Sequence, residues 1–165
     1  MAAALGAASL AMVFGPAAGA ETVLQKAKRD GIFRAPTADT RMLAAFARAQ
    51  QTLGGFIDAL DGKVAGATGF AVKIAVVDHG KTEYFWINAL SHAGSRFSGR
   101  INNRPETVTN VTFGQPISFS KGQIRDWSYV LDGRMQGSFT TCVLLSREDP
   151  AEAQELKAQI GLTCE

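Results

Sequence analysis

The residues that usually carry catalytic chemistry are scarce in this chain. Among 165 residues there are two histidines and two cysteines. The sequence has no GxSxG, HExxH, CxxC or EF-hand pattern and no glycine-rich phosphate loop. Residues 118–121 spell SxxK, but they follow Pro116 in a predicted strand, whereas that motif requires a helix and supporting SDN and KTG elements. The sequence therefore identifies no reaction.

The two imidazoles do not form a metal-binding pattern. His79 falls in a predicted turn and His92 at a predicted strand end. A catalytic zinc site would need a carboxylate in addition to these two ligands. Each histidine fits a solvated loop better, so we predict no metal and no other cofactor.

A marked excess of one charge is also lacking. Seventeen Lys and Arg residues face fifteen Asp and Glu residues, and the basic residues are scattered along the sequence. A nucleic-acid interface would need them clustered, so we predict no nucleic-acid partner. Ten Phe residues against two Tyr and two Trp indicate a buried aromatic core. With 46% apolar residues the chain can bury such a core, and we predict one globular domain over residues 37–165.

The first twenty residues contain no charged side chain. Leu5–Phe14 is apolar, Gly15-Pro16 breaks the run, and Ala18-Gly19-Ala20 resembles an A-x-A cleavage site. This pattern predicts a signal peptide over residues 1–20 and a periplasmic or secreted mature protein. A basic residue before the apolar run is missing, which a start codon assigned too far downstream would explain. The alternative is a retained anchor, although a span needs about 20 strongly apolar residues. After cleavage we expect no membrane span.

The two cysteines are Cys142 and Cys164. An exported protein meets an oxidising compartment, where an even number of cysteines favours pairing. We predict a disulfide that ties the C-terminal tail to the last strand and stabilises the fold by about 3 kcal/mol in the chain-entropy model. Two unpaired thiols are the alternative.

Helices are predicted at both ends of the domain. Residues 21–29 suit a short helix, followed by a linker to residue 36. Thr37 is then a candidate N-cap, with Asp39 favourable in the first turn. The Gly54-Gly55 pair predicts a kink or a restart of this helix. Its apolar stripe consists of Met42, Phe46, Ala49, Leu53, Phe56 and Leu60.

The C-terminal helix has the clearest start signal in the chain. Asp149 is its predicted N-cap, Pro150 occupies the first helical position, and Gly161 ends it.

A β-hairpin is predicted over residues 69–89, with its turn at His79-Gly80. Pairing Asp78 with Lys81 sets the register and puts Lys73 opposite Trp86. The ammonium of Lys73 could then lie over the indole. Tyr84 shares this mixed face. Such a pair acts either as a surface brace or as part of a ligand site.

Short extended runs follow at residues 96–101, 108–113 and 116–119, and a second hairpin turns at Asp132-Gly133. The two strands of this hairpin are predicted within residues 124–143, one on each side of the turn. The fold class is therefore α+β: a curved antiparallel sheet or small partly open barrel of about five to six strands, with an N-terminal and a C-terminal helix.

Asp126 lies near the start of the first strand of this hairpin. It is predicted to lie opposite Phe139 at the edge of the core. A buried carboxylate needs hydrogen-bond donors, which turn amides or a nearby Arg would supply. Asp126 is thus either a structural anchor or a catalytic carboxylate.

Several short motifs together resemble a family of bacterial proteins of unknown function, the YegJ-like family. The motifs are Phe70-x-x-Lys73, Glu83-x-x-Trp86, Phe97-x-Gly99, Asn103-x-Pro105, Gly114, Ile124-x-Asp126-Trp127 and Gly137-x-Phe139-Thr140. The preceding helix resembles the start of the same family, and the resemblance extends from Met42 to Leu145. Cys142 departs from the pattern, because a basic residue is expected there. The resemblance implies one compact domain and no particular activity.

Two classes of function remain open. The first is an exported, non-catalytic module that binds an unknown envelope protein, a peptide or a small ligand, since amphipathic aromatics are favoured at binding surfaces. Its candidate contact residues are Lys73, Tyr84, Trp86, Asp126 and Trp127.

The second class is a small hydrolase of unrecognised type, in which Asp126 acts with His92 or Glu83. Catalysis would require these side chains to converge within hydrogen-bond reach in a closed pocket.

Overall fold

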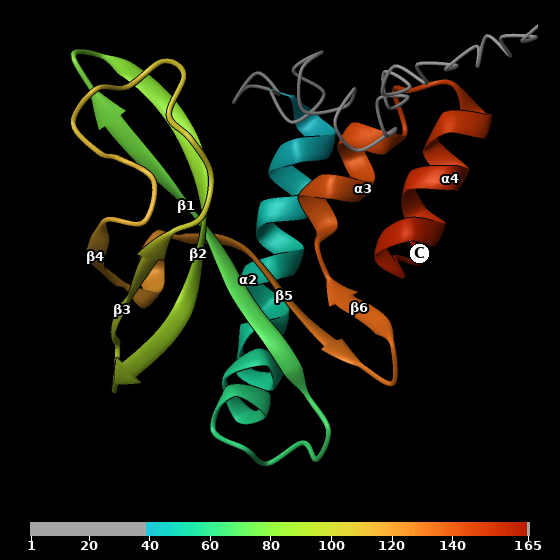
Figure 1. The fold of residues 1–165 in the computed structure, drawn as a ribbon, viewed down its shortest axis with the longest axis horizontal. Helices are drawn as coiled ribbons and strands as arrows, with labels where there is room; N and C mark the ends of the chain where they lie inside the picture. Colours follow the sequence, from blue (N-terminus) through green and yellow to red (C-terminus); the bar gives the residue numbers. More distant parts are fainter. Residues whose placement is uncertain (1–38, 165) are drawn as a thin grey trace, which may run out of the picture.

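The structure, a computed structural model, describes residues 39–164. The predicted signal peptide (residues 1–20) and the predicted helix and linker (21–36) lie outside these residues. The elements are α2 (Thr40–Leu60), β1 (Thr68–Asp78), β2 (Lys81–Ala93), β3 (Arg96–Ile101), β4 (Pro116–Ser120), η1 (Lys121–Gln123), β5 (Ile124–Leu131), β6 (Arg134–Gly137), α3 (Phe139–Leu145) and α4 (Pro150–Ile160) (Figure 1). None of the helices in this part of the chain is long and apolar enough to cross a membrane.

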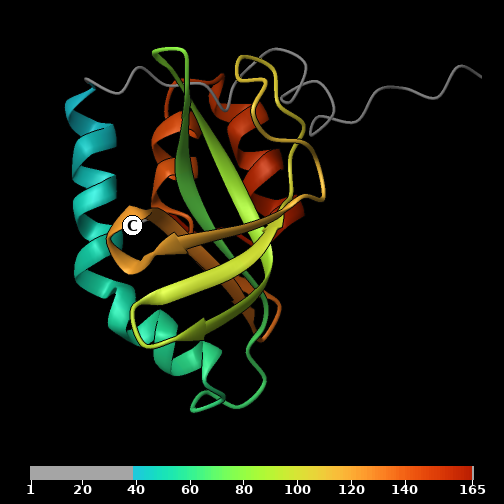
Figure 2. The same cartoon turned by 90° about the vertical axis from the view of Figure 1, so that its left-hand side faces the viewer.

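Six antiparallel strands form one open sheet in the order β4-β3-β2-β1-β5-β6. In the turned view, α2 runs along one side of the sheet and α3 and α4 lie behind the strands (Figure 2). The core lies between α2 and the sheet and holds large side chains such as Phe56, Phe85 and Phe97. The predicted α+β class with a curved antiparallel sheet is confirmed, with two C-terminal helices where one was predicted.

Helix α2 starts and continues differently from the sequence prediction. Its N-cap is Asp39, whose side chain accepts hydrogen bonds from the backbone N–H groups of Arg41 and Met42. Thr37, the predicted cap, lies outside the described residues. The predicted restart at Gly54-Gly55 does not occur, because α2 runs unbroken from Thr40 to Leu60 and its buried stripe continues past the two exposed glycines. The buried residues of α2 are Met42, Ala45, Ala49, Leu53, Phe56 and Ala59.

The first hairpin, β1–β2, has the predicted register. Asp78 pairs with Lys81, and Lys73 pairs with Trp86. His79 and Gly80 both have positive φ, which the two central positions of a type I′ turn require. The turn chemistry therefore determines which side chains share a face.

The connection between β3 and β4 contains no strand, so the predicted extended run at 108–113 is wrong. Carboxylates hold this segment in place of strand pairing. Glu83 accepts hydrogen bonds from the backbone N–H groups of residues 106–108. Asp78 accepts bonds from the backbone and the hydroxyl of Thr109. These bonds satisfy the backbone amides of Val108 and Thr109, the first two residues of the predicted run.

The second hairpin, β5–β6, has the predicted register from Leu131 and Arg134 outward, but β6 stops at Gly137 rather than near residue 143. Gly137 and Ser138 both have positive φ, which turns the chain out of the strand, and α3 begins at the next residue. A Cβ on Gly137 would lie 2.3 Å from the carbonyl oxygen of Trp127, so a side chain is excluded there.

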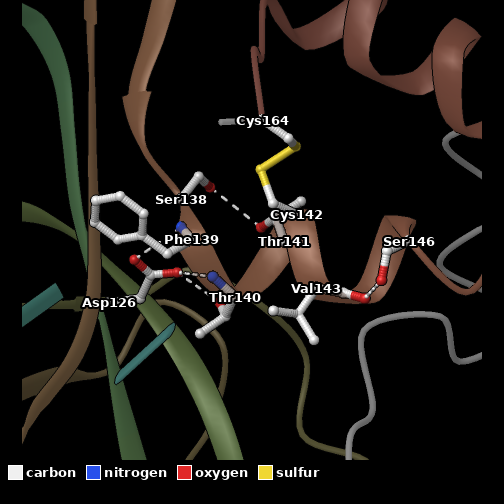
Figure 3. Close-up of a disulfide and its surroundings, with 9 residues drawn as sticks. All are labelled: Asp126, Ser138, Phe139, Thr140, Thr141, Cys142, Val143, Ser146 and Cys164. Atoms are coloured by element: carbon white, nitrogen blue, oxygen red, sulfur yellow. Dashed lines mark hydrogen bonds between the residues drawn. A yellow bond between two sulfur atoms is a disulfide. The ribbon is translucent and has the colours of Figure 1, made fainter. Parts of the chain in front are cut away.

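The C-terminal region agrees with the caps read from sequence. Asp149 caps α4, Pro150 is its first residue, and Gly161 ends it with positive φ. The predicted disulfide between Cys142 and Cys164 is present, with a Cα–Cα distance of 5.6 Å (Figure 3). Cys142 lies on α3 and not on a strand, so the disulfide joins α3 to the tail that follows α4. A small second core lies beside it, made of Leu145, Ala153, Leu156 and Leu162.

We expect the Cys142→Ala/Cys164→Ala variant to lose about 3 kcal/mol of unfolding free energy, because the unfolded chain regains the entropy of a loop that the disulfide closes. Urea unfolding followed by circular dichroism measures this. Adding a reductant should reproduce the loss in the wild type and change nothing in the variant. An intact mass unchanged by reduction, with both thiols open to labelling, would contradict the disulfide.

Candidate functional site

Three candidate residues lie in one row across the middle of the sheet. Asp126 on β5 pairs with Lys73 on β1, and Lys73 pairs with Trp86 on β2. Cross-strand partners lie on the same face, so these three side chains are neighbours. The fold thus brings a carboxylate, an amine and an indole together.

The carboxylate of Asp126 is fully buried. Its Oδ1 accepts hydrogen bonds from the backbone N–H groups of Trp127 (2.9 Å) and Phe139 (3.2 Å). Its Oδ2 accepts bonds from the backbone N–H (2.8 Å) and the hydroxyl (2.5 Å) of Thr140 (Figure 3). Phe139 and Thr140 are the first two residues of α3, whose own cap residue, Ser138, makes no side-chain cap bond. Asp126 therefore caps α3 from the neighbouring strand.

The hydroxyl of Thr140 bridges the two charged groups. It accepts a hydrogen bond from Lys73 Nζ at 2.5 Å and donates one to Asp126 Oδ2. Lys73 is 6% exposed, and its Nζ lies 4.7 Å from the centroid of the Trp86 ring. The amine is thus held by a hydroxyl, a carboxylate beyond it and the face of an indole.

Burial shifts the titration of both charged groups. It lowers the pKa of Lys73 to about 8, although the nearby Asp126 charge opposes the shift. Burial also raises the pKa of Asp126, against the opposing effects of Lys73 and of the hydrogen bonds from Thr140 and Trp127. Each charge is stabilised mainly by the other group and by the bonds around it.

Trp127 and Tyr84 do not join this row. The Trp127 side chain is in the core, where its Nε1–H donates to the carbonyl of Ala49 at 3.0 Å and its ring packs on Phe56. Tyr84 is half-buried with its ring 5.5 Å from that of Phe46, and burial raises its pKa. Trp127 is therefore a structural residue and is not available at the surface.

His92 and Glu83 are held by other partners. His92 Nε2 lies 2.7 Å from Asp61 Oδ1, and its ring stacks on Phe97. Glu83 binds the amides of residues 106–108. Neither residue is among the hydrogen-bond partners of Asp126 in the described part of the chain.

A hollow of about 480 Å³ lies further along β1 and β2, and none of the three residues of the row lines it. It lies beside a bulge in β2, where the pairing with β3 shifts between Asn88 and Ser91 and where Ala89 has positive φ. Gly99 permits this bulge, because a Cβ there would lie 2.6 Å from the carbonyl oxygen of Asn88. The lining residues are Leu60, Gly69, Phe70, Ala71, Asn88, Ala89, Leu90 and Asn102.

Sequence reasoning missed the hollow and the role of Thr140. A signal for Thr140 exists in the Gly137-Ser138 pair, since a glycine followed by serine at the end of a predicted strand is compatible with a turn into a helix. The hollow has no local signal, because its lining comes from the end of α2, the start of β1, the bulge of β2 and the segment after β3.

These features define an α+β protein whose buried aspartate joins an open antiparallel sheet to two C-terminal helices, with a disulfide between α3 and the tail that follows α4. Residues 39–164 match the model of a family described as "Uncharacterized protein conserved in bacteria (DUF2314)". The chain belongs to this family.

Two relatives show how far the similarity reaches. The chain is 38% identical over 105 residues to "Uncharacterized protein YegJ" of Escherichia coli K12. The aligned region covers 64% of this chain and 67% of that protein. It is 30% identical over 80 residues to a Neisseria meningitidis serogroup B protein named "Putative ankyrin repeat protein", covering 48% of this chain and 32% of that one. The chain thus spans about a third of the second relative. No solved structure matches it significantly.

Replacing Asp126 with Asn should lower the free energy of unfolding by about 3–5 kcal/mol, because Lys73 would keep a buried charge without its compensating carboxylate. The amide would also fail to accept all four bonds now made to the carboxylate. Asp132→Asn, at the exposed hairpin turn, is the matched control and should change stability little. Urea titrations of both variants measure the difference, and equal stabilities would refute the capping role.

Stability should also depend on the titration of Lys73. Its pKa falls from 10.5 to about 8 on folding, so the unfolded chain binds more protons between these pH values. The free energy of unfolding should therefore rise from pH 8 to pH 10.5 relative to Lys73→Met, by on the order of 3 kcal/mol. If the free energy of unfolding of the two proteins changes with pH in parallel, this prediction is contradicted.

Proposed function

We propose that this protein is an exported, non-catalytic binding domain whose ligand, a peptide segment or a small molecule, sits in the hollow between the end of α2, the start of β1 and the bulge of β2. The observation that carries the proposal is the lining of this hollow. Leu60, Phe70 and Leu90 supply apolar walls, while Asn88 and Asn102 supply amide groups. Binding sites combine apolar walls with a few placed polar groups in this way, and their volumes range from about 300 to 1,000 Å³.

The surroundings of the hollow support a preformed site. The backbone N–H of Asn102 donates to the carbonyl of Trp86 at 2.8 Å, and the N–H of Trp86 donates to the side chain of Asn103 at 2.9 Å. Trp86 in turn lies over Lys73, which is fixed by Thr140. A ligand would therefore meet an ordered wall, which reduces the entropic cost of binding.

Two observations support export. The Cys142–Cys164 disulfide is of a kind that persists in oxidising compartments. Residues 1–20 carry the apolar run and the small-residue site typical of a signal peptide. The periplasm or the cell exterior is thus the proposed location.

A hydrolase receives less support from the geometry. It would need Asp126 to act with His92 or Glu83, and these residues bond to Asp61 and to the 106–108 amides instead. Asp126 already accepts four hydrogen bonds, three of them from Phe139 and Thr140 at the start of α3. A binding role places no such demand on the carboxylate.

The test is a screen of small-molecule fragments and short peptides against the purified protein by ¹H–¹⁵N NMR. Binders should shift the amide signals of residues 69–71 and 88–90. Ala71→Leu fills the hollow with a side chain that a strand tolerates, and it should weaken such binders roughly tenfold through steric exclusion. Ala75→Leu, on the same face of the same strand but outside the hollow, should leave binding unchanged.

Two results would count against the proposal. Binders whose affinity is unchanged by Ala71→Leu would place the site elsewhere. A broad screen that shifts no amide signals around the hollow would argue against a ligand there.

A further inference from the structure

One segment of the chain, residues 91–125 with β3 and β4, has an excess of basic residues. Residues 91–125 contain five basic residues and a single acidic one, Glu106. The rest of the described chain contains eight basic and eleven acidic residues. The basic residues of this segment are Arg96, Arg100, Arg104, Lys121 and Arg125.

Two of these arginines lie on one face of β3 with hydroxyl groups between them. Arg96, Ser98 and Arg100 alternate along the strand and therefore point the same way. Ser98 pairs with Ser91 on one side, where their Oγ atoms are 2.8 Å apart, and with Ser118 on the other. The face thus presents a row of small hydroxyls flanked by two exposed guanidinium groups.

Arg100 links this face to the hollow. It pairs across the strands with Asn88, which lines the hollow, so the two side chains are neighbours. Its Nη1 donates to the carbonyl of Gly114 at 3.0 Å, which holds the guanidinium in place. A guanidinium has five N–H donors, and this one bond leaves donors to meet a carboxylate.

We infer that the ligand of the hollow is an acidic peptide segment, an inference that rests on the proposed binding function. One apolar side chain of the segment enters between Leu60, Phe70 and Leu90, and neighbouring Asp or Glu residues meet Arg100 and Arg96. The Asn88 and Asn102 amides and the serine row can hydrogen-bond a peptide backbone, whereas an acyl chain offers no groups for them. Charge complementarity therefore favours an acidic partner, and the polar groups favour a peptide over an anionic lipid.

The test begins with phage display of random heptapeptides on the purified protein. The wild type should select peptides in which Asp or Glu flank a large apolar residue. Arg100→Gln should lose the acidic preference and keep the apolar one. Arg134→Gln, an exposed arginine on β6 at the other end of the sheet, should select as the wild type does.

Fluorescence anisotropy then compares a selected peptide with its Glu→Gln and Asp→Asn counterpart. The acidic form should bind roughly tenfold more tightly at low salt, and Arg100→Gln should remove most of that difference. The difference should also shrink in 1 M salt, where the Debye length falls to about 3 Å.

The outcomes separate this inference from the function on which it rests. If the selected peptides bind Ala71→Leu more weakly but show no preference for acidic residues, the inference is overturned and the binding function stands. Peptides unaffected by Ala71→Leu would overturn both. Competition by phosphatidylglycerol vesicles, without competition by neutral vesicles, would replace the peptide by an anionic membrane surface and so overturn the assignment of the ligand.

Discussion

The junction between the sheet and the C-terminal helices depends on the buried carboxylate of Asp126. Two of its four hydrogen bonds come from the first amides of α3, those of Phe139 and Thr140, which the Gly137-Ser138 turn leaves without a local cap. Lys73 compensates its charge through Thr140, and Cys142 follows one turn later on the same helix. The direction of α3 and the position of the disulfide therefore both depend on one buried carboxylate.

The motifs that carry the family resemblance fall mainly on this framework. Gly137 makes room for the backbone and ring of Trp127, and Gly99 makes room for the bulge of β2. Glu83 and Asn103 hold segments around the β1–β2 hairpin by accepting backbone hydrogen bonds. Family membership thus accounts for the architecture, while the proposed ligand contacts lie largely at positions outside these motifs.

Local chemistry explains which parts of the fold were predictable. The His79-Gly80 and Asp132-Gly133 turns determine strand register within a few residues, and both registers are as predicted. The wrong secondary-structure predictions concern segments whose hydrogen-bond partners are distant in sequence. Residues 108–113 look extended, but carboxylates from β1 and β2 hold this region as a loop. Residues after Gly137 look like strand, but a carboxylate on β5 caps them as a helix.

The sequence by itself determined the strand faces, the caps of α4, the partnership of Lys73 with Trp86 and the cysteine pair, because each follows from short-range geometry or from counting. Only the tertiary structure decided that Thr140 joins Lys73 to Asp126, that Trp127 is a core residue and that a hollow lies beside Arg100. Lys73 and Thr140 are 67 positions apart. Contacts over such separations depend on how the helices pack on the sheet, which no local pattern specifies.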